Sequence, residues 1–318
     1  MFRLIFIGAL SAAFFSSTFV LNRAMSLEGG HWLWSAILRY GFMLCFLISG
    51  MVLSGHGKRL KEIFAAYREN WTFWTVSGST GFGVFYSMLC FSASYAPGWV
   101  VATTWQTTIL ASPLVLLLFG KKVPTKALLF IMLIFTGIVL VNLEHATTAS
   151  LKELALGALP ILVAAFAYPL GNQMVWEAQR GGCKRIPDIQ NPLLHNAFSR
   201  ITLLTLGSIP FWIILAITIA PPPPLSGQWF NTALVALFSG IIATSLFLHA
   251  RHLATNAYEI SAIDSTQSSE VLFSLLGEII FLGGVLPGTF GMLGIALTMT
   301  GLIFYVKTQY SHPNPADS

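Results

Sequence analysis

Hydrophobic residues fall into ten long runs separated by short polar segments. Each run holds about 18 to 28 residues, and a helix needs about 20 to cross the hydrocarbon of a bilayer. Only helices or closed barrels span lipid, and continuous apolar runs favour helices over strands that alternate in polarity. The pattern therefore predicts ten transmembrane helices. They are expected at Leu4–Leu21, Trp32–Leu53, Trp71–Ala93, Trp99–Gly120, Pro124–Leu143, Leu154–Val175, Leu193–Ala220, Trp229–Leu253, Glu259–Gly283 and Gly288–Val306.

Composition agrees with a polytopic membrane protein. The 318 residues are 55% hydrophobic and only 9% charged, whereas soluble domains carry about 25% charged residues. The net charge of +5 does not indicate nucleic-acid binding, because the basic residues sit in short loops. Three cysteines give neither a disulfide framework nor a CxxC motif, so no cofactor is predicted.

The first run resembles a secretory signal peptide, because Arg3 precedes an apolar stretch with small residues. The same segment recurs later in the chain, however, and a cleaved signal would not form half of an internal repeat. We therefore interpret it as the first transmembrane helix.

Lysine and arginine positions predict the orientation, because cytoplasmic loops are enriched in them. With the N-terminus inside, 13 of the 17 fall on the cytoplasmic side and two, Arg23 and Lys152, on the other, while Arg39 and Arg200 lie within spans. Both termini are therefore expected in the cytoplasm of a cell with the protein in its inner membrane. The 13 are Arg3, Lys58, Arg59, Lys61, Arg68, Lys121, Lys122, Lys126, Arg180, Lys184, Arg185, Arg251 and Lys307.

The two halves of the chain show a weak internal repeat. A shift of 161 residues superposes Arg39 on Arg200 and Gln106 on Gln267, and a shift of 149 superposes the Gly-Ala-Leu that starts at Gly8 on a second copy. Five helices per copy would invert the second copy in the membrane, which is a transporter architecture. We expect an all-α fold with repeats at 1–146 and 147–310, a central cavity between them, and a disordered tail at 311–318.

The chain resembles the drug/metabolite transporter superfamily. The resemblance rests on the five-plus-five helices, on Arg39 and Arg200 in the second helix of each half, and on the run Asp264-x-Thr-Gln-x-x-Glu270 leading to Gly277-Glu278. Within the superfamily the chain is most similar to the EamA-like, ten-helix type and its multidrug-resistance efflux branch. The resemblance implies a secondary transporter that exports small molecules by alternating access.

One feature departs from the four-helix multidrug members, which carry a coupling glutamate in their first helix. The first and sixth predicted spans contain no acid here. Any proton coupling must therefore use another residue.

The ninth span contains three carboxylates, Asp264, Glu270 and Glu278. Ionisable groups at membrane depth cost about 2.5–3.5 kcal/mol each on insertion scales, so they favour a functional site. Glu270 lies nearest the middle of the bilayer, and its counterpart in the first half is Ile109. It is a candidate proton carrier, and the alternative is a protonated acid held structurally by a neighbour.

Polar residues of other spans complete the predicted substrate pathway. Gln106 and Gln267 are suited to bind a polar substrate or to bond across helices, and Trp105 to stack on a planar or cationic solute or simply to pack. Tyr168 and Asn172 flank Pro169 and Gly171, which loosen the backbone and favour a gate.

Matching depths predict an ion pair between Arg200 and Asp264 at an inner gate. Arg39 lies at the corresponding depth on the outer side, where Glu278 is the ninth-helix acid at its level.

Three alternatives remain open: a metabolite permease without drug specificity, a membrane enzyme acting on lipid-linked substrates, and a structural subunit. The enzyme is disfavoured because neither HExxH nor GxSxG occurs, and the polar ninth span disfavours the structural subunit. His249 and His252 lack a further ligand, so no metal site is predicted. The expected partners are a small-molecule substrate, protons and the bilayer, and the oligomeric state is left undecided.

Overall fold

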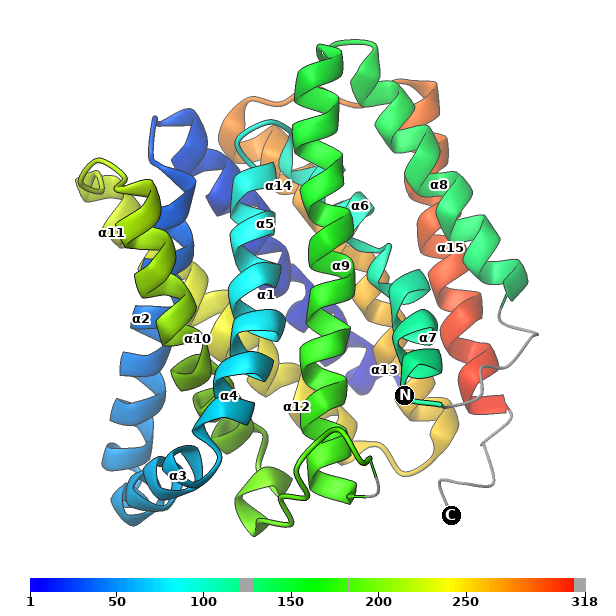
Figure 1. Ribbon diagram of the computed structural model, residues 1–318. Coiled ribbons are helices and arrows are strands. Elements are labelled where there is room, and N and C mark those ends of the chain that lie inside the picture. Colours follow the sequence, from blue (N-terminus) through cyan, green and yellow to red (C-terminus); the bar gives the residue numbers. More distant parts are fainter. Residues whose placement is uncertain (121–127, 182, 312–318) are drawn as a thin grey trace.

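The computed structural model describes residues 1–120, 128–181 and 183–311, and this part of the chain is built from helices joined by short loops (Figure 1). The predicted tail beyond Ser311 and the loop lysines Lys121, Lys122 and Lys126 lie outside the described residues. The main helices are α1 (Phe2–Leu27), α2 (Trp32–Leu53), α3 (Gly57–Glu69), α4 (Trp71–Gly78), α5 (Phe85–Ser92), α6 (Gly98–Trp105), α7 (Thr108–Leu118), α8 (Leu128–Ala146), α9 (Leu151–Arg180), α10 (Ala197–Ile219), α11 (Ser226–Val235), α12 (Thr244–Leu253), α13 (Ala257–Ser265), α14 (Ser269–Leu282) and α15 (Thr289–Ser311).

Within the described ranges, eight helical stretches are long and apolar enough to cross a membrane. The other two predicted spans are helical as well, at Trp71–Ser92 and Ala257–Leu282, but are not among these eight. The first of them is rich in Ser, Thr and Gly, and the second contains four acids, so both are less apolar than an ordinary span. These two stretches are the ones expected to face protein or solute rather than lipid.

Four of the helical stretches change geometry midway. The π-helical segment η1 (Ser79–Val84) joins α4 to α5, and a second one, η4 (Ala236–Ala243), joins α11 to α12. A 3-10 turn, η5 (Thr266–Ser268), joins α13 to α14, and Gln106 and Thr107 separate α6 from α7. Such interruptions weaken the regular backbone hydrogen bonding and frequently lie at functional sites.

One helix was not predicted. The basic segment after α2 folds into α3, which is amphipathic: Ile63 and Ala66 are buried, whereas Lys61 and Glu62 are exposed. The sequence predicts a loop for this segment, because the segment is too polar and too short to span a membrane.

Close contacts between glycines set the packing of several helices. A Cβ on Gly171 of α9 would collide with the backbone of Gly81 in η1, and one on Gly207 of α10 would collide with the backbone of Trp74 in α4. Gly137 of α8 likewise meets the backbone of Gly294 in α15. Small residues thus let helix backbones approach closely, as in other membrane bundles.

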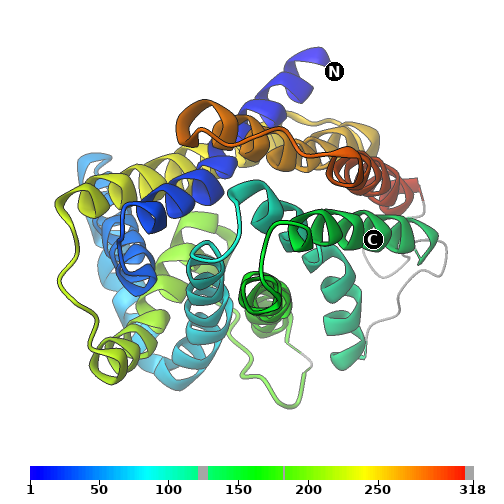
Figure 2. The ribbon, with the colours of Figure 1, turned by 90° about the horizontal axis from the view of Figure 1, so that it is seen from above.

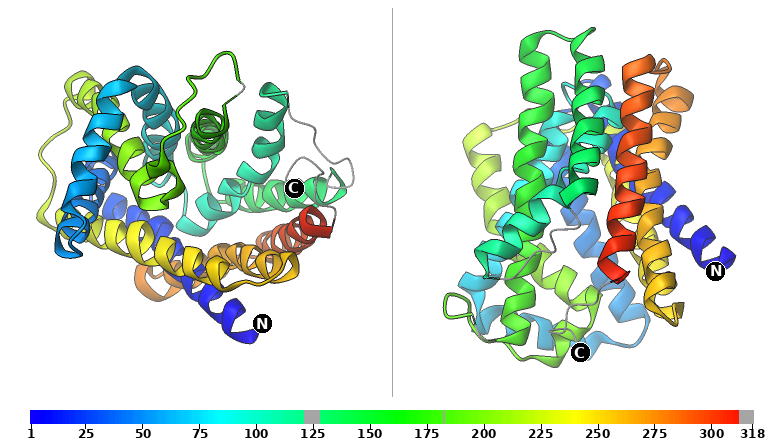
Figure 3. Two further views of the ribbon diagram at one scale, coloured as in Figure 1. Left: turned by 90° about the horizontal axis from the view of Figure 1, so that it is seen from below. Right: turned by 90° about the vertical axis from the view of Figure 1, so that its right-hand side faces the viewer.

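Two helices each contact several others: α9 in one part of the bundle and α1 in another. Seen along the bundle, α9 lies between α5 and α7, and α8 runs beside α15 (Figure 2). Helix α1 packs against α14, η4 and α12, and α10 packs against α4 and η1. The views from below and from the side show α8 and α15 closing one flank of the bundle (Figure 3).

Candidate functional site

A buried arginine defines one side of the candidate site. Arg39 of α2 is only 8% exposed, and its guanidinium carbon lies 4.1 Å from the centre of the Tyr86 ring and 5.0 Å from that of Tyr40. Its Nη2 donates a long hydrogen bond of 3.5 Å to Ser239 of η4. Its Nε has no hydrogen-bond partner among the described residues. Aromatic faces attract the guanidinium, but no carboxylate of the described residues pairs with it.

A buried polar network holds Tyr86 against this arginine. The side-chain amide of Asn22 in α1 donates to the Tyr86 hydroxyl at 2.9 Å and to the carbonyl of Thr18 at 2.7 Å. The Cys90 thiol donates to the Asn22 carbonyl oxygen at 3.4 Å. Asn22, Tyr86 and Cys90 are each at most 3% exposed, so these bonds satisfy groups that water does not reach.

Three aromatic rings lie next to this network. Phe85 of α5 lies 4.8 Å from Trp105 of α6 and 5.0 Å from Tyr168 of α9, and Trp105 lies 5.7 Å from Tyr168, all between ring centroids. We call Phe85, Trp105 and Tyr168 the aromatic cluster. Tyr168 keeps 38% of its surface exposed. The Tyr168 ring is therefore only partly covered by its neighbours.

Tyr168 connects the two charged sides of the site. Its hydroxyl interacts electrostatically with the Glu270 carboxylate of α14 and with the Arg39 guanidinium of α2. Glu270 is partly exposed, and it is the second residue of α14, which begins where the 3-10 turn η5 ends. Among the described residues it has neither a basic partner nor a hydrogen bond. Helices α2, α9 and α14 thus bring Arg39, Tyr168 and Glu270 of the predicted pathway to one region, beside Trp105.

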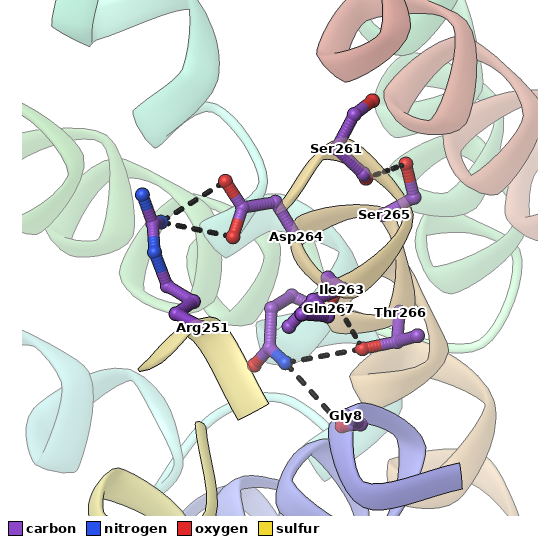
Figure 4. A network of polar contacts seen from close by, with 8 residues as sticks. All are labelled: Gly8, Arg251, Ser261, Ile263, Asp264, Ser265, Thr266 and Gln267. Carbon is purple, nitrogen blue, oxygen red and sulfur yellow. Dashed lines mark hydrogen bonds and ion pairs between the residues drawn. The ribbon is translucent and has the colours of Figure 1, made fainter. Parts of the chain in front are cut away.

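The predicted ion pair between Arg200 and Asp264 is wrong. Asp264 of α13 instead pairs with Arg251 of α12, whose Nη1 lies 2.9 Å and 3.0 Å from its two carboxylate oxygens (Figure 4). Arg200 lies half-buried near the start of α10, a helix that packs on α4, η1 and α2, whereas α13 packs on α15 and α1. Equal depth along the membrane normal did not bring the two helices together.

The two glutamines lie at the interruptions of their helical stretches. Gln106 stands between α6 and α7 and donates to the Ala102 carbonyl at 3.4 Å. Gln267 lies in η5 and donates to the Gly8 carbonyl of α1 at 3.5 Å, beside Thr266 (Figure 4). Both bonds are long, so each amide is held weakly where it lies.

Glu278 lies away from Arg39, whereas Asn172 lies next to Tyr168. The Glu278 carboxylate accepts a hydrogen bond from the backbone of Gly98 at 2.9 Å and interacts with Arg23, rather than with Arg39 at its predicted level. Asn172 donates to the Tyr168 carbonyl one turn before it at 2.9 Å. Helix α9 continues unbroken through Pro169 and Gly171. The gate predicted there stays a prediction.

Sequence reasoning missed three residues of the site: Asn22, Phe85 and Tyr86. Asn22 had a usable signal, because it is a lone amide near the end of an apolar run. Phe85 and Tyr86 had none, since aromatic residues are frequent throughout this chain.

Comparison with known proteins decides the family. The model of the family described as "EmrE: Putative multidrug resistance efflux transporter" matches residues 2–311. The chain belongs to this family. The resemblance to the drug/metabolite transporter superfamily is thereby confirmed over nearly the whole chain.

Two bacterial relatives show the extent of the EmrE-family similarity. The uncharacterized protein YjlA of Bacillus subtilis (strain 168) is 36% identical over an alignment of 319 residues including gaps. The alignment covers 95% of this chain and 94% of YjlA. The uncharacterized 42.1 kDa protein in the intracellular alkaline protease 3'region of Shouchella clausii is 39% identical over 256 residues, covering 77% of this chain but 63% of that protein. A known crystal structure shares the fold, with a TM-score of 0.60 at 15% identity over 97% of this chain and 98% of its own.

Proposed function

We propose that this EmrE-family protein is a secondary transporter that exports small molecules across the cell membrane by alternating access. The observation that carries the proposal is Glu270: a carboxylate without a basic partner, placed at the interruption of a membrane helix and beside an aromatic cluster. Unpaired ionisable groups at such depth mark solute or proton pathways. A metabolite permease without drug specificity would use the same architecture and differ only in its cargo.

Ten membrane spans arranged as an inverted repeat are part of this proposal. The interruptions support it: at a shift of 161 residues, the start of α7 at Thr108 coincides with the start of α14 at Ser269, and η5 coincides with residues 105–107. The π-helical segments η1 and η4 likewise fall in the third stretch of each half.

Helix packing supports the same repeat. The third stretch, containing α5 and η1, packs on α9, and the eighth, containing η4 and α12, packs on α1. The fourth stretch packs on α9 and the ninth on α1, while α8 and α15, the last helix of each half, pack on each other. These contacts are related by an exchange of the two halves. Inverted repeats of this kind provide two exchangeable arrangements around a central site.

We further propose that both termini face the cytoplasm and that Glu270 carries the coupling proton. The 13-to-2 distribution of lysine and arginine supports the orientation. The position of Glu270 between Tyr168 and the interruption at η5 supports the second point, because a carboxylate without a basic partner is free to take up and release a proton.

Flux measurements in proteoliposomes test the proposed function. The full chain is reconstituted, and uptake of a panel of labelled amines, amino acids and planar cations is measured with and without a pH gradient. The proposal expects uptake of at least one solute above empty liposomes, accelerated by the gradient. Absence of protein-dependent flux for the whole panel would contradict a transport function.

A further inference from the structure

Among the described residues, Arg39 and Glu270 of the candidate site are not paired with each other or with another group of opposite charge. Arg39 has electrostatic contacts to Tyr86, Tyr40 and Cys90, all of them uncharged in their ordinary states, and none to a carboxylate of the described residues. Glu270 in turn has no contact to a base there. Leaving one buried charge unpaired is costly, typically about 3–5 kcal/mol when a partner is removed. Arg39 is such a buried charge, and Glu270, although partly exposed, also lacks a partner of opposite sign, so a ligand that pairs both groups is favoured.

One side chain, Tyr168, lies within electrostatic reach of both groups. The Tyr168 hydroxyl interacts with both Arg39 and Glu270, and Tyr168 is also part of the aromatic cluster. A molecule bound against Tyr168 is therefore close to a cation and to an acid of the protein. The Nε of Arg39 is buried and unpartnered, so it retains an unused donor for a carboxylate oxygen.

From these observations we infer that the transported solute is a small zwitterion whose carboxylate binds Arg39 and whose cationic nitrogen binds Glu270 against the aromatic cluster. The inference rests on the proposed transport function and adds the chemical class of the substrate. A solute with only a cationic group would leave the Arg39 charge unpaired, and a solute with only a carboxylate would leave Glu270 unpaired. Either loss is a penalty that the zwitterion avoids.

The surroundings of each charge fit this assignment. The guanidinium carbon of Arg39 lies 4.1 Å from the centre of the Tyr86 ring, which the Asn22–Tyr86 hydrogen bond of 2.9 Å holds in place, and a guanidinium can donate in its plane to a carboxylate. On the other side, the rings of Phe85, Trp105 and Tyr168 offer negative faces to an ammonium group. An aromatic or compact apolar body between the two groups fits against the same rings.

Binding of three probes that share one scaffold tests the inference. Phenylalanine carries both charges, phenethylamine only the amine, and 3-phenylpropanoate only the carboxylate. Binding to the purified full-length protein is measured by displacement and by thermal stabilisation. We expect wild-type protein to bind phenylalanine about tenfold or more tightly than either single-charge probe, which is the value of one charge-assisted hydrogen bond.

Two variants assign the two ends separately. Arg39→Gln is expected to reduce the affinity for phenylalanine to that for phenethylamine, with phenethylamine binding unchanged. Glu270→Gln is instead expected to reduce the affinity for phenylalanine to the affinity for 3-phenylpropanoate. Lys61→Gln, on the exposed side of α3, removes a charge of the same sign as Arg39 outside the site and should change neither ranking. Where Arg39→Gln does not fold, the wild-type ranking decides alone.

The outcomes separate this inference from the proposed function. Wild-type protein that binds phenethylamine as tightly as phenylalanine, or binds none of the probes, overturns the zwitterion assignment and leaves transport of other solutes untouched. Protein that prefers phenylalanine by tenfold but produces no flux of any solute in proteoliposomes overturns the transport function and leaves the binding site standing.

Discussion

The side-chain amide of Asn22 donates to the hydroxyl of Tyr86 at 2.9 Å, and the ring of Tyr86 lies against the guanidinium of Arg39. This relationship connects α1, α5 and α2 through groups that are almost completely buried. The position of the arginine therefore depends on a hydrogen bond in which the arginine itself takes no part.

Removing one partner of this bond should be more damaging than removing both. We expect Asn22→Leu to lower the free energy of unfolding by about 1–3 kcal/mol, because it leaves the Tyr86 hydroxyl and the Cys90 thiol buried without their partner. Adding Tyr86→Phe should recover part of that loss, since the orphaned hydroxyl is then absent. Thermal unfolding in detergent measures both variants. A double variant less stable than Asn22→Leu would show that the hydroxyl has another role.

The close approach of Gly171 to Gly81 gives a second prediction. Gly171→Ala adds a methyl group where the backbone of η1 leaves no room, so α9 and η1 must separate. We expect a loss of about 1–3 kcal/mol in unfolding free energy. Gly41→Ala is the matched control, because no atom lies within 4 Å of its new methyl group and alanine favours a helix. Equal melting temperatures for Gly171→Ala and wild type would contradict this close packing.

The ion pair between Arg251 and Asp264 gives a third prediction. The two side chains are 40% and 16% exposed, so the pair is partly solvated and should contribute about 1 kcal/mol or less. Asp264→Arg alone should destabilise the protein by placing two cations side by side. The exchange Asp264→Arg with Arg251→Asp should restore most of the stability, as judged by thermal unfolding. Failure of the exchange to improve on Asp264→Arg would indicate that the position, rather than the pair, matters.

This pair also shows what the sequence could and could not predict. Hydrophobic runs gave the positions of the helices, including α2 with both ends correct, because burial in lipid acts on every residue of a span. Depth along the membrane followed from counting residues at a fixed rise. Which helices are neighbours did not follow, since depth says nothing of position around the bundle. Asp264 therefore pairs with Arg251, on the helix just before it in the chain, and not with Arg200.

The interruptions of the helices could not be predicted from the sequence either. Nothing in the local sequence of Gln106 and Thr107, or of η5, requires a break, because Thr, Gln and Ser are tolerated within helices. At η5 the hydroxyls of Thr266, Ser268 and Ser269 each donate to the carbonyl three residues before them, and Thr266 also packs so closely on Gly8 of α1 that a methyl group there would collide with it. The site residues Phe85 and Tyr86 were missed for a related reason: their roles come from the rings and amides that the fold brings to them.

Cysteine labelling gives a fourth prediction, on orientation. In a variant lacking the native cysteines Cys45, Cys90 and Cys183, Lys61→Cys on α3 should resist an impermeant thiol reagent added to intact cells. Lys152→Cys, near the start of α9, should react from outside, because it lies on the side with few basic residues. Membrane disruption should expose Lys61→Cys to the reagent. Labelling of Lys61→Cys in intact cells would invert the proposed topology.

The last prediction concerns Glu270. If this carboxylate carries the coupling proton, Glu270→Gln should abolish flux driven by a pH gradient while the protein stays folded, because glutamine keeps the shape and loses the titration. Exchange of solute down its own gradient should outlast the loss of coupling, at the reduced affinity expected for the variant, since alternating access itself needs no proton. Glu62→Gln, an exposed acid of α3, is the control and should behave as wild type. A structural role as a protonated acid instead predicts that Glu270→Gln is nearly silent. Undiminished gradient-driven flux in a well-folded Glu270→Gln protein would therefore exclude Glu270 as the proton carrier and direct attention to Asp264, the next carboxylate along the same helical stretch.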